Sequence, residues 1–73
     1  MVTVFGLGFV GLTTALGFAH FGYDVYGVDV DEVRKERLRK GEIPFMEPHM
    51  KEELQEHLNK NFFVTDDIEE AVS

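Results

Sequence analysis

Short apolar runs that predict strands alternate along the chain with longer segments that predict helices. Glycine or acidic residues mark most of the boundaries between them. Residues 2–5 form an apolar, β-favouring run that ends at a glycine, which is typical of a buried parallel strand. Residues 11–21 are apolar, contain alanine and lack proline. They predict a helix of about three turns, buried on most sides and ended by Gly22. Residues 24–29 predict the second strand.

The second half of the chain is more highly charged. It predicts a solvent-facing helix at residues 31–40, a loop at 43–48, a second charged helix at about 48–59, a third strand at 62–65 and the start of another helix at 67–72. Acids begin the first of these helices and bases end it, which suits the helix dipole at both ends, and Gly41 follows. Pro48 suits the first position of the next helix. The acids of residues 52–56 are expected on a solvated face, and the expected core side chains here are Phe62, Phe63, Ile68 and Val72.

A glycine motif lies between the first predicted strand and the first predicted helix, in the pattern Gly6-x-Gly8-x-x-Gly11. Gly6 permits a tight turn, Gly8 lets a pyrophosphate approach the backbone, and Gly11 lets the helix pack closely on the strand. Phe9 and Val10 would contribute backbone N–H groups. The amides and dipole at the start of the helix would then hold the anion. The motif in this context predicts a Rossmann-type phosphate-binding unit.

Asp29 closes the second predicted strand, 18 residues after Gly11, and the Rossmann fingerprint expects an acid at about this spacing. Its carboxylate would accept hydrogen bonds from the adenosine ribose and repel a 2′-phosphate, so NAD is favoured over NADP. Arg34 would lie in the first turn of the next helix, beside the adenosine pocket. It would cover the adenine or reach a ribose oxygen, or else pair with Glu32 or Glu36.

The order of predicted elements, β-α-β-α-α-β, indicates an α/β fold with a parallel sheet and right-handed crossovers. A complete dinucleotide-binding domain needs two such halves, and residues 1–73 supply about one. We therefore expect the first half of a three-layer, doubly wound Rossmann sheet, belonging to a larger protein. The strand at residues 2–5 would have an unpaired apolar edge, which predicts self-association that a monomeric mass at high concentration would contradict.

Composition excludes several classes of function. The net charge of −7 argues against nucleic acids and anionic membrane surfaces as partners, and no apolar run approaches a transmembrane span. The beginning of the chain lacks the basic region of a signal peptide, so the cytoplasm is the expected location. The chain has no cysteine. His20 is expected to be partly buried and structural, while His49 and His57 lie eight residues apart, so we assign no metal ligand and no catalytic residue.

Four blocks of sequence resemble the UDP-glucose/GDP-mannose dehydrogenase family, the nucleotide-sugar 6-dehydrogenases, in order and spacing. They are Val4-Phe5-Gly6-Leu7-Gly8-Phe9-Val10-Gly11-Leu12, Val28-Asp29-Val30-Asp31, Lys40-Gly41-Glu42-Ile43-Pro44-Phe45-Met46-Glu47-Pro48 and Val64-Thr65-Asp66-Asp67. The third block is the most specific of them, and the resemblance covers nearly the whole chain. His49 departs from it, because the family usually has glycine there.

The resemblance implies a pyrophosphate at residues Gly6, Gly8, Phe9, Val10 and Gly11, Asp29 on the adenosine ribose, and Arg34 near that ribose. The family oxidises a sugar alcohol to the carboxylate (uronate) in two NAD-dependent hydride transfers, with a cysteine-bound intermediate between them. The parent protein is therefore expected to be such an enzyme, acting at C6 of a nucleotide sugar such as UDP-glucose. This chain lacks cysteine, so we do not expect activity from it alone.

Three other interpretations stay open on the sequence. The chain could be a non-catalytic module that senses NAD, which intrinsic binding without further domains would support. It could be the flavin-binding front of an oxidoreductase, which uses a similar fingerprint. An S-adenosylmethionine methyltransferase ranks last, because its glycine motif is usually looser than the one found here.

Overall fold

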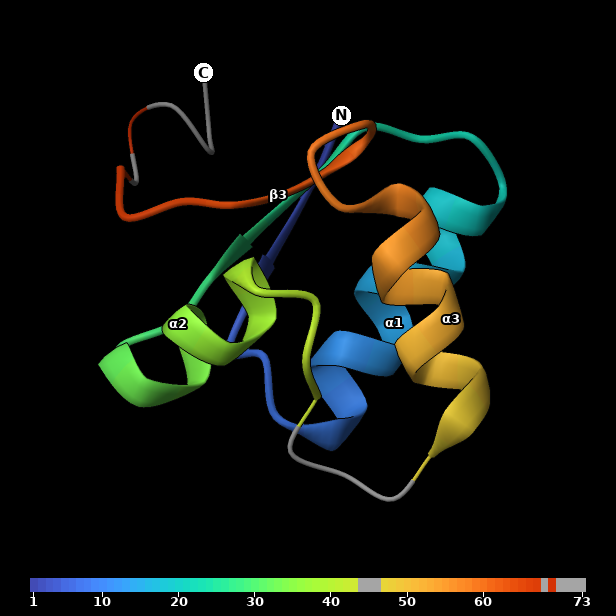
Figure 1. Ribbon diagram of the computed structural model, residues 1–73. Coiled ribbons are helices and arrows are strands. Elements are labelled where there is room, and N and C mark those ends of the chain that lie inside the picture. The colour runs from blue at the N-terminus through green and yellow to red at the C-terminus, as the bar shows by residue number, and fades with distance from the viewer. Residues whose placement is uncertain (44–46, 68, 70–73) are drawn as a thin grey trace.

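The chain folds as alternating strands and helices around one parallel sheet, in a computed structural model that describes residues 1–43, 47–67 and 69 (Figure 1). The elements are β1 (Val2–Phe5), α1 (Phe9–His20), β2 (Val25–Val28), α2 (Glu32–Arg39), α3 (Pro48–His57) and β3 (Phe62–Val64). This order confirms the β-α-β-α-α-β sequence predicted from the hydrophobic pattern. Most of the predicted helix at residues 67–72, and half of the predicted loop at 43–48, fall outside the described residues.

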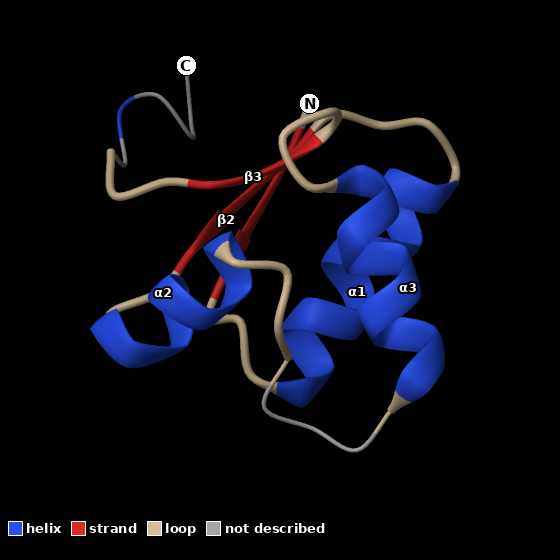
Figure 2. Cartoon of the chain, viewed as in Figure 1, coloured by secondary structure: helices blue, strands red, loops and turns tan. Residues whose placement is uncertain are grey.

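The three strands form a sheet in the order β1-β2-β3, with both pairs parallel (Figure 2). Val25 of the central strand lies between Val2 on one side and Phe62 on the other. Within the described part of the chain, β1 is therefore an edge strand, as predicted. That this edge pairs with a second copy stays a prediction.

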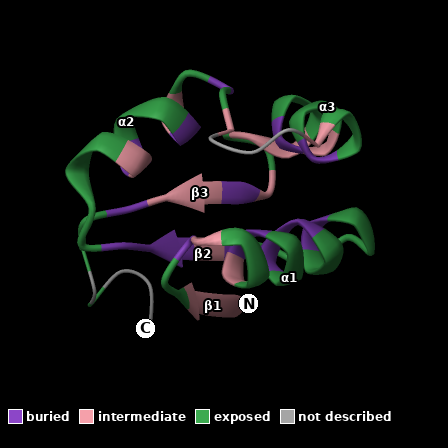
Figure 3. Ribbon diagram, turned by 90° about the horizontal axis from the view of Figure 1, so that it is seen from below, coloured by how far each residue is buried: buried purple, intermediate pink, exposed green. Residues whose placement is uncertain are grey.

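One hydrophobic core joins the sheet to all three helices (Figure 3). Its buried members are Leu7, Leu12, Ala15, Leu16, Ala19, Val25, Leu38, Met50, Leu54 and Phe62. Phe62 is fully buried, which confirms its predicted core position. Phe63 instead points to the opposite face, since strand side chains alternate, and there its ring lies 5.4 Å from the ring of Tyr26. The expected core residues Ile68 and Val72 are outside the described residues.

Helix α1 is buried along one side only, so the expectation that it is buried on most sides was wrong. Its buried residues follow one stripe, Leu12, Ala15, Leu16 and Ala19. Val10 is 76% exposed, and Phe18 is also exposed. The physical reason is that the sheet and α3 cover only one side of the helix in the described part of the chain. The helix also begins two residues earlier than predicted, because Gly8 acts as its N-cap.

Helices α2 and α3 both begin at an acidic N-cap. The Asp31 carboxylate accepts a hydrogen bond from the Arg34 amide at 3.0 Å, and Glu47 caps α3 in the same way ahead of Pro48. These caps satisfy amides that have no partner within the helix.

Helix α2 was expected to face solvent, but Lys35 and Leu38 are buried. The Lys35 ammonium donates hydrogen bonds to Glu32 and to Asp66, which follows β3. These bonds raise the pKa of Lys35 above its ordinary value, and the hydrogen bonds from Lys35 and Arg39 lower the pKa of Asp66. A buried cation therefore joins α2 to the end of the third strand. Among the described residues, none of the helices is both long and apolar enough to span a bilayer.

Candidate functional site

The candidate site lies where β1 and β2 end, because parallel strands bring their carboxyl ends to the same edge of the sheet. β1 ends at Phe5, directly before the glycine loop, and β2 ends at Val28, directly before Asp29. The Gly6 amide donates to the Val28 carbonyl at 2.7 Å, which holds the start of the loop beside the end of β2. The two parts of the predicted site are therefore neighbours in the fold.

Two of the three motif glycines are required by the chain itself, Gly6 by its backbone conformation and Gly11 by close packing. Gly6 has a φ of +89°, a backbone conformation that side chains other than glycine rarely adopt. A Cβ on Gly11 would lie 1.8 Å from the Gly6 carbonyl oxygen. Helix α1 therefore contacts the loop so closely that only a hydrogen fits between them.

Gly8 differs, because nothing in the described part of the chain requires glycine there. Its φ of −69° is open to any residue, and a Cβ would meet no atom of the described residues within 4 Å. The first hydrogen bond of α1 runs from the Leu12 amide to the Gly8 carbonyl, and the first turn carries no acidic residue. Open space in front of a helix N-terminus suits an anion.

The Asp29 carboxylate connects the glycine loop to α2. Its Oδ2 accepts hydrogen bonds from the Leu7 amide at 2.7 Å and from Arg34 Nη1 at 3.0 Å, and its Oδ1 accepts one from the Asp31 amide at 2.8 Å. The side chain is only 4% exposed. A carboxylate has about four acceptor positions, so three are in use without any ligand.

These contacts set the acidity of Asp29. Burial raises the pKa of this carboxyl, but the hydrogen bonds from the Asp31 and Leu7 amides, together with the Arg34 guanidinium, outweigh burial. The pKa of Asp29 therefore lies below its ordinary value, and the carboxylate is charged at neutral pH.

Arg34 lies in the first turn of α2, as predicted, but its partner differs from both acids that the sequence suggested. It pairs with Asp29, and its other guanidinium nitrogen lies 4.0 Å from Asp31. The side chain remains 32% exposed, so it can move without opening the core. Arg34 thus neutralises the acid that is predicted to hold the ribose.

Sequence reasoning missed the contact that supports the loop from below. Gly27 lies in the middle of β2, and a Cβ there would come within 2.9 Å of both Leu7 methyl groups. Leu7 is fully buried in the space that Gly27 leaves open. A glycine inside a strand often marks such a close approach, and this was the available signal.

Acid should weaken the fold through Asp29. Because its pKa is lowered by folding, the stabilisation is complete above the unfolded value of about 3.9 and is lost as pH falls through the folded pKa. We expect the free energy of unfolding, measured in urea from pH 6 to pH 2, to fall more steeply in the wild type than in Asp29→Asn. Asp24→Asn, which removes an exposed carboxylate, should keep the wild-type slope. Equal slopes in all three proteins would contradict this role.

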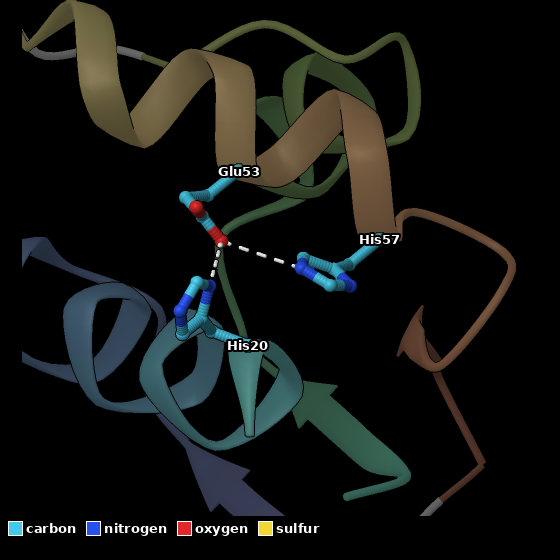
Figure 4. Close-up of side chains that lie close together, drawn as sticks. All are labelled: His20, Glu53 and His57. Atoms are coloured by element: carbon cyan, nitrogen blue, oxygen red, sulfur yellow. Dashed lines mark hydrogen bonds and ion pairs between the residues drawn. The ribbon is translucent and has the colours of Figure 1, made fainter. Parts of the chain in front are cut away.

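The three histidines are not arranged as the sequence suggested. His20 was expected to be partly buried, but its side chain is 60% exposed, since it ends α1 at the surface. Glu53 was expected on a solvated face, but it is half-buried between His20 and His57 (Figure 4). The fold brings these two histidines together, while His49 is exposed in the first turn of α3.

Comparison with known proteins identifies the family. Residues 1–73 match the model of the UDP-glucose/GDP-mannose dehydrogenase family, NAD binding domain. The chain belongs to this family. The resemblance seen in the sequence is thereby confirmed, and so is NAD as the cofactor of this domain. The UDP-glucose/GDP-mannose dehydrogenases are oxidoreductases that act on nucleotide sugars.

Individual members of the UDP-glucose/GDP-mannose dehydrogenase family match over most of this chain. An uncharacterized protein from Methanocaldococcus jannaschii is 44% identical over 88% of the chain, and UDP-glucose 6-dehydrogenase from Rhizobium meliloti is 40% identical over 99%. The structure of a UDP-glucose dehydrogenase from Pyrobaculum islandicum aligns over 97% of the chain with a TM-score of 0.87 and 40% identity. The chain spans 7%, 17% and 17% of these proteins, respectively.

Proposed function

We propose that residues 1–73 form the adenosine-diphosphate-binding half of an NAD-binding domain, in an enzyme that oxidises a nucleotide sugar at C6 to the uronate. UDP-glucose is the proposed example of a substrate. The observation that carries the proposal is the open space at Gly8, which the packing of the described residues does not explain and a pyrophosphate would fill. The second half of the NAD domain and the sugar-binding domain would lie outside these residues.

Each predicted site residue has a defined task in this proposal. The backbone amides of residues 8–11 would hold the pyrophosphate, with the exposed side chains of Phe9 and Val10 pointing away from the core. Asp29 would accept hydrogen bonds from the ribose hydroxyls. Bound NAD supplies the nicotinamide that takes the hydride from the sugar.

Arg34 would change partner when the ribose binds. With three of the four acceptor positions of Asp29 in use, the carboxylate can take two ribose hydroxyls only if one present donor leaves. The Leu7 and Asp31 amides belong to the backbone, whereas the Arg34 side chain is partly exposed. We therefore propose that Arg34 swings from Asp29 onto the adenosine.

The reaction itself would need groups from outside these residues. The chain contains no cysteine to form the covalent intermediate, so the prediction that it is inactive alone stands as a proposal. A nucleotide sugar would be the partner of the whole enzyme. The family match does not favour the flavin-binding or NAD-sensing alternatives. The cytoplasmic location stays a prediction.

Titration with NADH, followed by the fluorescence of the dinucleotide, tests the proposed phosphate site. Gly8→Ala should fold normally, because its methyl group meets no atom among the residues that the structure describes. It should bind NADH about tenfold more weakly, since the methyl would occupy the proposed phosphate space. Gly17→Ala is the matched control, because it adds the same methyl to an open position further along α1. Equal NADH affinity in both variants would exclude a phosphate at Gly8.

A further inference from the structure

A cluster of three metal-ligating side chains lies between α1 and α3, away from the glycine loop (Figure 4). His20 is the last residue of α1, and Glu53 and His57 lie one turn apart on α3. Glu53 Oε2 is 3.3 Å from His20 Nδ1 and also 3.3 Å from His57 Nε2. One ligand atom from each residue falls within 4.8 Å of the other two.

Neighbouring hydrogen bonds determine where His57 carries its proton. Asn61 Nδ2 donates to the carbonyls of Ala19 and Tyr23, at 2.8 and 3.1 Å, so the amide orientation is defined and Oδ1 is left as an acceptor. Asn61 Oδ1 lies 2.9 Å from His57 Nδ1, which must therefore be the protonated nitrogen. In a neutral ring, Nε2 then directs a lone pair at the Glu53 carboxylate.

Among the described residues, no hydrogen-bond donor faces this lone pair of His57 Nε2. His57 Nε2 is buried and, among the residues that the structure describes, has no hydrogen-bond partner. A lone pair and a carboxylate oxygen 3.3 Å apart repel each other unless a cation lies between them. The cation is either a proton or a metal ion.

The distances favour a metal ion. Zn²⁺ binds histidine nitrogen and carboxylate oxygen at about 2.0–2.2 Å in tetrahedral geometry, which separates neighbouring ligand atoms by about 3.3–3.5 Å. Two of the three distances between ligand atoms, those to Glu53 Oε2, agree with this separation, and the distance from His20 Nδ1 to His57 Nε2 is within 4.8 Å. A tight hydrogen bond to a protonated imidazole would instead be about 2.7–2.9 Å long.

We propose that His20 Nδ1, Glu53 Oε2 and His57 Nε2 bind one Zn²⁺ ion. Asn61 orients the His57 ring, as partners of metal-bound histidines generally do. A groove of about 460 Å³ reaches His20 and Glu53, which leaves room for water as the fourth ligand. Because the ligands come from two helices, the ion would crosslink the end of α1 to α3.

Equilibrium dialysis of the chain against Zn²⁺ at pH 7.5, with metal analysis, tests the proposal together with thermal unfolding in Zn²⁺ or in chelator. We expect one ion per chain. At free Zn²⁺ a hundredfold above Kd, the melting temperature should rise by about 10 °C or more relative to chelator. A chain that takes up no Zn²⁺ overturns the proposal.

Histidine variants locate the bound ion. His20→Gln removes one ligand from an exposed position, where folding is little affected, and should weaken Zn²⁺ binding about a hundredfold. His49→Gln is the matched control, since it makes the same exchange at an exposed histidine of α3 outside the cluster, and should bind as the wild type does. Equal affinity in the two variants would overturn the proposed ligand set.

Discussion

Replacing Gly11 by alanine should lower the free energy of unfolding by about 3 kcal/mol, near the upper end of overpacking effects. The added Cβ would lie 1.8 Å from the Gly6 carbonyl oxygen and 2.9 Å from its carbonyl carbon. Both are backbone atoms, so no side chain can rotate to make room, and α1 must move away from the loop. Urea unfolding followed by circular dichroism measures the loss.

Gly17→Ala is the control for this substitution, because it makes the same exchange within the same helix. A Cβ at Gly17 meets no atom within 4 Å. Alanine also has the higher helix propensity, so this variant should be more stable than the wild type by about 0.5–1 kcal/mol. If the two variants had similar stabilities, the close contact between α1 and the loop would be refuted.

Asp29→Ala should weaken NADH binding about a hundredfold. Under the proposed function, the variant would lose hydrogen bonds from two ribose hydroxyls to a charged acceptor, each worth about 1.5 kcal/mol. It also leaves the Leu7 amide without its acceptor, which would loosen the glycine loop. Fluorescence titration with NADH measures the combined effect.

Titration with NADPH separates recognition of the ribose from damage to the loop. A loosened loop should weaken the binding of NADH and NADPH to the same extent, because both dinucleotides contain the pyrophosphate. Removing the negative charge of Asp29 relieves repulsion of the 2′-phosphate and should therefore narrow the preference for NADH over NADPH. An unchanged preference would mean that Asp29 serves the loop and not the ribose.

The fold could be predicted from the sequence because its signals are local. The strand at residues 2–5, the glycines that follow it and the acid after the second strand lie within 30 residues of one another. Pro48 likewise indicated the start of α3 correctly. Each of these signals can be recognised within a short stretch of the chain, without knowledge of contacts between distant residues.

Contacts between distant residues could not be predicted in this way. Lys35 is one base within a charged run, and its burial depends on Asp66, 31 residues further along the chain. His20 meets Glu53 across 33 residues, where spacing along one helix gives no information. For the same reason, the sequence offered two acids as partners for Arg34, and the fold supplied a third, Asp29.

Because Leu7 packs against Gly27, the residue allowed at either of these positions depends on the residue at the other. The Leu7 methyl groups leave no room for a Cβ at position 27. A larger residue there is tolerated only if position 7 becomes smaller, and a smaller residue at position 7 leaves a cavity unless position 27 fills it. Relatives that lack glycine in the second strand should therefore have a smaller residue at the loop position that corresponds to Leu7. The combined side-chain volume of the two positions would then stay about the same.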